Sequence, residues 1–155
     1  MMSNDLQEYI KSLDIQEIRL ISGEHILAEI LHQSDDEFAI KDPILVERPI
    51  GSGQTAFIEW FPYSEDQYFS LNKDHIVCAS EVDYHSKVHF CRMATANKVR
   101  RIGVSGSDVS TDDMQLFREL LIEESNLNQS RHSSHTQDDA AEPAWVESLD
   151  TSIIH

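Results

Sequence analysis

Basic side chains are concentrated in one part of the sequence, between residues 84 and 101. The cations there are Lys87, Arg92, Lys98, Arg100 and Arg101. Ring-bearing residues are interleaved with them, namely Tyr84, His85 and Phe90. Cations bind a phosphate backbone and rings stack on bases, so this composition is compatible with a nucleic-acid site. A solvated helix face with cations near its carboxyl end explains the same pattern, and both interpretations stay open.

Metal binding and catalysis have weaker signals in the sequence. His85 and His89 stand at i and i+4, a spacing that presents two imidazoles on one helix face. A structural metal site usually takes four ligands, and no second cluster stands at a matching spacing, so we predict no metal and no cofactor. The sequence has neither a glycine-rich phosphate loop nor a nucleophile-elbow pattern. We therefore predict that the protein is not an enzyme.

Two further groups of residues are candidates for binding a partner. One group is aromatic and flanks a predicted loop at 62–67: Trp60, Phe61, Tyr63, Tyr68 and Phe69. These rings are either core or an exposed partner site. The other group follows a polar stretch near the end of the chain and suits one helix face: Trp145, Leu149, Ile153 and Ile154. We predict that this C-terminal segment binds a partner protein; packing on its own domain is the alternative.

Composition limits the class of protein. The chain has 155 residues, about one domain, and a formal net charge of -16, which repels a phosphate backbone. More than half of that excess lies in residues 104–155, with 11 acidic and 2 basic side chains. No signal sequence and no membrane span is recognisable, so we expect a cytoplasmic protein. Cys78 and Cys91 are expected to be buried thiols rather than a disulfide.

The elements that position these residues follow from the hydrophobic pattern. Residues 4–13 have the period of a short helix, and from residue 16 the period changes to two. We predict strands at 18–20, 26–30, 38–46 with a break at Asp42-Pro43, 56–61 and 75–79, and an extended piece at 68–71. Short strands with no helix between them indicate a mainly β barrel or sandwich.

Helices are expected after the last strand. Asp83 is a predicted N-cap for a helix over 84–101, and Ser110 caps a second helix that ends near Glu124. From Asn126 onward the composition predicts a disordered acidic tail. The predicted divisions are 1–82 (N-terminal helix and barrel), 83–125 (helical extension) and 126–155 (tail with an apolar terminal segment).

Residues 18–40 resemble the first motif of Sm-like proteins. An apolar strand is followed by Gly23, and Ile26, Ala28 and Ile30 come three, five and seven residues after it, before an acidic turn. Residues 72–77 (NKDHIV) resemble a degenerate second motif. The phrases LISGEHILAEI, KDPILVE and EWFPYSEDQYFSLNKDHIV are similar to small Sm-like proteins of marine bacteriophages.

This resemblance implies a five-stranded antiparallel barrel with an N-terminal helix, joined edge to edge into a homo-oligomeric ring. The RNA-binding residues of the family are not intact, because Ala39 to Lys41 and Asn72-Lys73 stand where its asparagine and arginine-glycine signatures are expected. We therefore predict a non-enzymatic ring-forming scaffold, of phage origin and present in the host cytoplasm, that acts through protein contacts. The alternative is an RNA-binding regulator that uses the basic helix 84–101.

Overall fold

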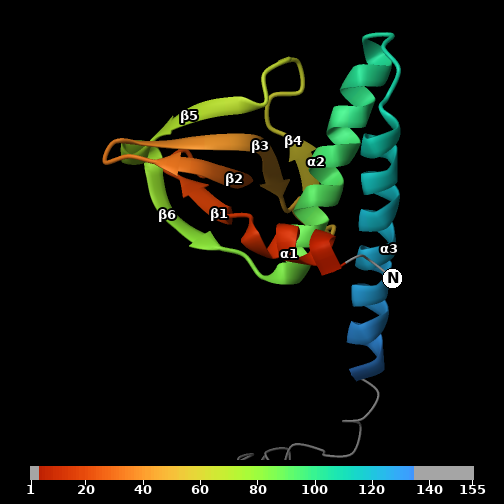
Figure 1. Ribbon diagram of the computed structural model, residues 1–155. Helices are drawn as coiled ribbons and strands as arrows, with labels where there is room; N and C mark the ends of the chain where they lie inside the picture. Colours follow the sequence, from red (N-terminus) through yellow and green to blue (C-terminus); the bar gives the residue numbers. More distant parts are fainter. Residues whose placement is uncertain (1–3, 135–155) are drawn as a thin grey trace, which may run out of the picture.

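A computed structural model describes residues 4–134 of the chain (Figure 1). A curved antiparallel sheet lies beside a pair of long helices, and a short helix precedes it. The elements in chain order are α1 (Asn4–Ser12), β1 (Ile15–Leu20), β2 (His25–Gln33), β3 (Glu37–Glu47), β4 (Ala56–Glu59), β5 (Tyr68–Asn72), the 3-10 helix η1 (Lys73–His75), β6 (Ile76–Glu81), α2 (Tyr84–Val104) and α3 (Thr111–Ser134).

The sheet has six strands, and the prediction of a closed five-stranded barrel is wrong in both respects. The strand order is β4-β3-β2-β1-β6, and β5 also pairs with β3, so the sheet is not closed. β5 is the piece at 68–71 that the sequence analysis expected only to be extended. It pairs with the first half of β3, and β4 pairs with the second half. A loop at 60–67 separates the two short strands, so one long strand has two successive partners along its edge.

The break at Asp42-Pro43 explains why β3 changes partner. Leu27 and Glu29 of β2 are two positions apart, whereas the residues paired with them in β3, Ile44 and Lys41, are three positions apart. β3 therefore contains one extra residue at this point. Asp42 has a positive φ of 51°, and proline has no N–H to donate. This is a β-bulge, which bends a strand and exchanges the faces of the residues that follow.

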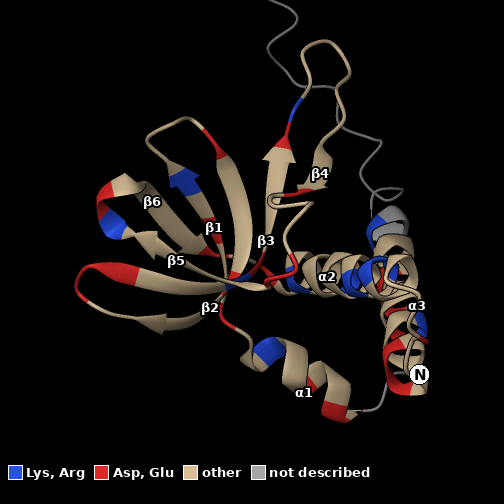
Figure 2. Cartoon of the chain, turned by 90° about the horizontal axis from the view of Figure 1, so that it is seen from above, with Lys and Arg blue, Asp and Glu red and all other residues tan. Residues whose placement is uncertain are grey.

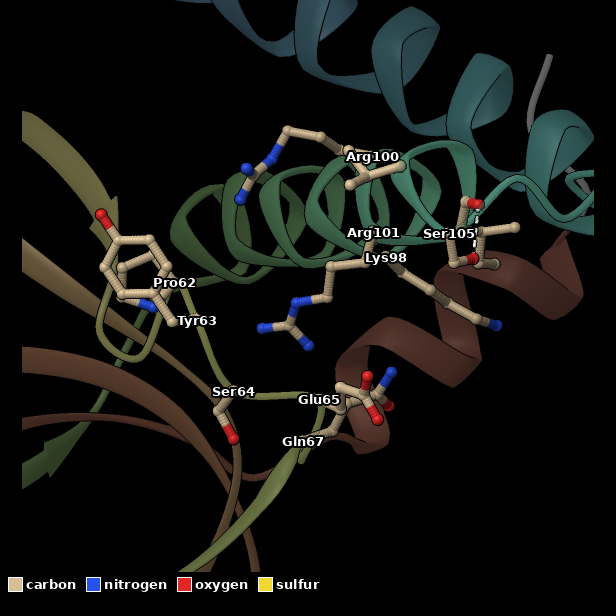
Figure 3. A pocket seen from close by; sticks show the side chains of 11 residues that line it. Pro62, Tyr63, Ser64, Glu65, Gln67, Lys98, Arg100, Arg101 and Ser105 are labelled. Carbon is tan, nitrogen blue, oxygen red and sulfur yellow. Dashed lines mark hydrogen bonds between the residues drawn. The ribbon is translucent and has the colours of Figure 1, made fainter.

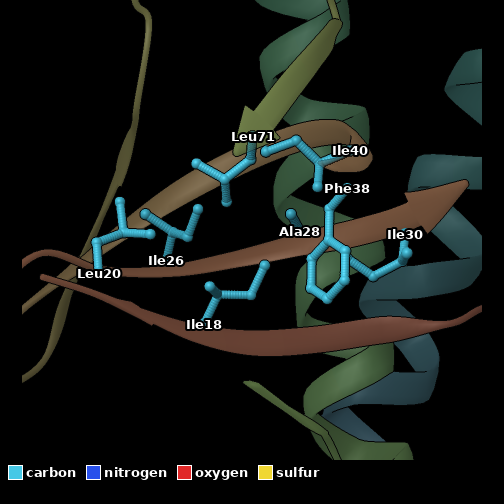
Figure 4. Close-up of a cluster of buried hydrophobic side chains, with 8 residues drawn as sticks. All are labelled: Ile18, Leu20, Ile26, Ala28, Ile30, Phe38, Ile40 and Leu71. Carbon is cyan, nitrogen blue, oxygen red and sulfur yellow. The ribbon is translucent and has the colours of Figure 1, made fainter. Parts of the chain in front are cut away.

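The exchange of faces gives the sheet two buried sides. Its inner side forms the largest apolar cluster, which includes Leu71 from β5 (Figure 4). The buried residues of this cluster are Ile18, Leu20, Ile26, Ala28, Ile30, Phe38, Ile40 and Leu71. Beyond the bulge, Ile44 points to the other side, where it packs with Ile15, Leu27 and Phe90 of α2. Alternation along β1, β2 and β3 therefore serves two cores rather than one core and solvent.

The helices form a third cluster. Ile10 of α1, Val88 of α2 and Leu120 of α3 are buried together. Asp83 caps α2 as predicted, since its carboxylate accepts a hydrogen bond from Ser86 N at 2.7 Å. α3 continues to Ser134, past its expected end near Glu124, so residues 126–134 are helical where the sequence analysis placed the start of the tail. Leu127, which packs on this cluster, explains the extension; residues 135–155 lie outside the described part.

Lys87 connects three elements at the centre of this arrangement. Its side chain is only 5% exposed. Its Nζ donates to the carbonyl oxygens of Leu13 at 2.7 Å and Lys11 at 3.2 Å, and it pairs with Glu81 at 2.6 Å. The carbonyls at the end of a helix have no partner within it, so this ammonium group satisfies the end of α1. Lys87, predicted to contact nucleic acid, is a buried structural residue in this fold.

We expect Lys87→Met to lower the free energy of unfolding by about 2 to 4 kcal/mol, because two carbonyls at the end of α1 and the carboxylate of Glu81 lose their buried partner. Urea denaturation followed by circular dichroism measures the change. Lys11→Met is the matched control, since the Lys11 side chain is exposed, and we expect a change below about 1 kcal/mol. Equal effects of the two substitutions would contradict this role for Lys87.

Candidate interaction surfaces

The curved sheet leaves strand edges without a partner. Among the described strands, β6 pairs only with β1, whereas β4 and β5 pair only with β3. Apolar side chains are exposed at both edges: Val77 of β6 is 65% exposed, and Ile58 of β4 and Tyr68 of β5 are also exposed. An unpaired edge presents free N–H and C=O groups to another chain. The sheet therefore has two surfaces suited to main-chain pairing.

The turns at the far end of the sheet contain the residues of the degenerate second motif. Lys73 N donates to the carbonyl of Asp36 at 2.8 Å, which ties η1 to the β2–β3 turn. The Asn72 side chain accepts from Asp74 N at 2.8 Å and so caps η1. The Lys73 ammonium lies 5.3 Å from the Phe38 ring centroid. Asn72 and Lys73 are thus engaged in local structure in a region rich in carboxylates.

The structure does not gather the five predicted nucleic-acid-binding cations into one patch. Besides the buried Lys87, Arg92 pairs with Glu124 of α3 on one side of α2. Lys98 lies 2.8 Å from Asp113 at the other end of the helix pair. Arg100 and Arg101 both contact the carboxylate of Glu59. Every one of the five cations therefore already has a carboxylate partner within the chain (Figure 2 shows the acidic and basic residues).

Glu59 is a residue that the sequence analysis did not single out. Its side chain is only 6% exposed at the end of β4, and the two guanidinium groups at the end of α2 bind it. A buried charge is tolerated when it is paired in this way. A lone glutamate in the apolar run AFIEWF was the available signal. Glu59 attaches an edge strand to the last turns of α2.

Lys98, Arg100 and Arg101 do share one open cavity of about 560 Å³ (Figure 3). The loop at 62–67 forms its opposite wall, where Tyr63 is fully exposed. Glu65 also lines the cavity, and Glu59 and Asp113 neutralise the cations. The cavity thus has an aromatic ring and three cations, but little net positive charge.

The predicted aromatic cluster divides into two parts. Trp60 and Phe69 pack against the main core, and Trp60 Nε1 donates to Glu24 at 3.1 Å. Phe61 stacks on Phe69 with ring centroids 4.6 Å apart. Tyr63 and Tyr68 are exposed. Part of the cluster therefore belongs to the core, and two of its rings are exposed.

The two histidines at helical spacing do not meet a common ligand. His85 Nε2 lies 3.0 Å from Asn128 Oδ1, and His89 Nδ1 contacts Glu124. Within residues 4–134, no group of three histidine, cysteine or acidic side chains is arranged to hold a metal ion.

The two cysteines are free thiols in different environments. Burial raises the pKa of Cys91 to about 12, with Glu29 contributing. Cys78, expected to be buried, is exposed on β6. The predicted partner-binding residues Trp145, Leu149, Ile153 and Ile154 lie outside the described residues.

Comparison with known families bears on the curved sheet. Residues 17–90 match the family model described as the Sm-like domain. This stretch is similar to Sm-like domains. The matched residues cover the six strands, except the first two residues of β1, and the beginning of α2. The antiparallel six-stranded sheet with flanking helices fits an Sm-like fold. No curated protein matches the chain. None of the helices within residues 4–134 combines the length and apolar character needed to cross a membrane.

The contact of Glu124 with α2 predicts a dependence of stability on pH. Burial alone would raise the pKa of Glu124, but the hydrogen bond from His89 and the charge of Arg92 outweigh it and lower the pKa. A carboxyl group whose pKa is lower in the folded state stabilises that state above its unfolded pKa, near 4.5, and this contribution is lost as the pH falls through the folded pKa.

We therefore expect Glu124→Gln to flatten the fall in melting temperature that the wild-type protein shows between about pH 5 and pH 3. Thermal unfolding across that range measures it. Glu8→Gln, at an exposed position, is the control and should leave the slope unchanged. A slope unaltered by Glu124→Gln would show that this pairing does not contribute.

Proposed function

We propose that this protein is a non-enzymatic, ring-forming Sm-like scaffold that acts through contacts with other proteins. Members of the Sm-like family are generally binding proteins rather than enzymes, and they typically form rings that bind RNA. The observation that carries the proposal is the pair of open sheet edges, β6 on one side and β4 with β5 on the other. Each edge exposes apolar side chains beside its unpaired main chain.

Pairing between copies follows from the difference between these edges. If β6 of one copy adds to the β5 edge of the next, the contact is head to tail, because different surfaces meet. Such contacts form a closed ring when the rotation between copies is a whole fraction of a turn, and the pairing then covers the β6 and β5 edges. Val77 and Tyr68 would be buried in this contact.

Protein contacts are favoured over RNA because of how the cations are used. All five predicted nucleic-acid-binding residues have carboxylate partners, and Asn72 caps η1. The net charge of -16 opposes a phosphate backbone further. The alternative, an RNA-binding regulator, rests on the cavity shared by Lys98, Arg100, Arg101 and Tyr63.

Two parts of this proposal rest on the sequence alone. A bacteriophage origin, with the host cytoplasm as the place of action, follows from the phrases that resemble small phage proteins of this family. Binding of a partner protein by Trp145, Leu149, Ile153 and Ile154 follows from their spacing at the end of the chain. The ring would present several copies of this segment, and multivalent presentation strengthens binding.

Native mass spectrometry of the full chain, with and without added RNA oligonucleotides, tests the assembly and its cargo together. We expect a multiple of the 17.7 kDa chain mass and no retained RNA at physiological salt. Val77→Lys should shift the mass toward the monomer, because a lysine on the edge opposes pairing. Ile50→Lys is the matched control, since Ile50 is exposed in the 48–55 loop and not on an edge. A monomeric wild-type protein would refute the ring, and retained RNA would favour the alternative.

Replacing Trp145, Leu149, Ile153 and Ile154 by serine tests the terminal segment. We expect loss of an identified, cross-linked partner protein and an unchanged melting temperature, because the apolar contacts are made with the partner. A lower melting temperature would instead show that this end packs on its own domain. If neither partner binding nor melting temperature changes, both interpretations fail.

A further inference from the structure

A second cavity, of about 520 Å³, lies where the outer face of the sheet meets the beginning of α2. The cavity lies on the same face of the sheet as the contact between Leu27 and Phe90 of α2, next to the part that the helix covers. Four apolar side chains form one part of its wall: Leu27, Val46, Phe57 and Val82. Polar and charged side chains line the rest of it, and its volume lies in the range of small-molecule sites.

Three of the eight histidines of the chain line this cavity. Each ring already has one nitrogen in contact with the protein. Glu17 Oε1 lies 2.6 Å from Nε2 of His25, and the contacts of His85 with Asn128 and of His89 with Glu124 were described above. Nε2 of His89 is buried and has no hydrogen-bond partner within the described residues. A buried polar atom without a partner is unfavourable unless something else binds it.

The charges around the cavity favour an anion. Both of its carboxylates are engaged, Glu17 with His25 and Glu124 with His89 and Arg92. Arg48 also lines the cavity, and it has neither an ion pair nor a side-chain hydrogen bond with any residue of the described part. A free guanidinium group binds a carboxylate through two parallel hydrogen bonds. The unmatched charge in this cavity is therefore positive, although the chain as a whole is acidic.

The aromatic groups favour a flat ligand. Phe57 is partly exposed and meets the His89 ring edge to face, with centroids 4.7 Å apart and an angle of 69° between the planes. A ring beside them would contact Val46 and Leu27 as well. From these observations we propose that the cavity binds an aromatic carboxylate, with the carboxylate on Arg48 and the ring against Phe57.

Ligand-observed fluorine NMR on the full chain tests this proposal, with 4-fluorobenzoate as the probe. We expect binding by the wild-type protein and at least about a tenfold weaker binding by Arg48→Gln and by Phe57→Ala, because each removes one of the two contacts. Arg118→Gln, an exposed arginine of α3 outside the cavity, is the matched control and should bind like the wild type.

Three results would overturn the proposal. Absence of binding to the wild-type protein at millimolar probe would do so. Equal binding of the uncharged 4-fluorobenzyl alcohol would remove the role of Arg48, and displacement by equimolar inorganic phosphate would remove the role of the ring. The ring assembly is judged separately by native mass, because the whole cavity belongs to one chain: a monomeric protein that binds the probe refutes only the scaffold.

Discussion

One extra residue in β3 decides how the layers of this protein are built. Ile40 and Ile44 are an even number of residues apart and would face the same side of a regular strand. Because of the bulge, Ile40 enters the inner core and Ile44 faces the helices. Without this bulge the apolar residues of the second half of β3 would point to the wrong side. The bend also provides two separate partners for β3, and the loop at 60–67 lies between them. Both the open edge formed by β4 and β5 and the cavity beside that loop depend on this position.

Charged groups inside the protein connect the sheet to the helices. Lys87 joins the end of α1, the end of β6 and the first turns of α2, and Glu59 joins β4 to the last turns of α2. Isolated charges in such places are unfavourable, and pairing makes them specific for one arrangement. These contacts lie toward opposite ends of α2, so the helix is held at two points. The basic side chains of α2 therefore form ion pairs within the protein that stabilise the fold.

The sequence predicted the elements well where the period was clear. The alternation from Ile18 to Ile30, the Asp83 cap and the two helices are present in the structure. The β-bulge was visible only as a break, because a single sequence does not show which residue lacks a partner in the ladder. The ion pairs of Lys87 and Arg92 were also not predictable, because their carboxylate partners, Glu81 and Glu124, lie on other elements. Local pattern predicts helices and strands, whereas ion pairing depends on the tertiary fold.

The attachment of β4 to α2 through Glu59 has a mechanical consequence. β4 is an edge strand, so a chain that pairs with it would pull on the strand to which both arginines are bound. The same α2 is packed along α3, and α3 leads directly into residues 135–155. A displacement of β4 by a paired chain would therefore reach the helices through Glu59 as well as β3 through the strand pairing.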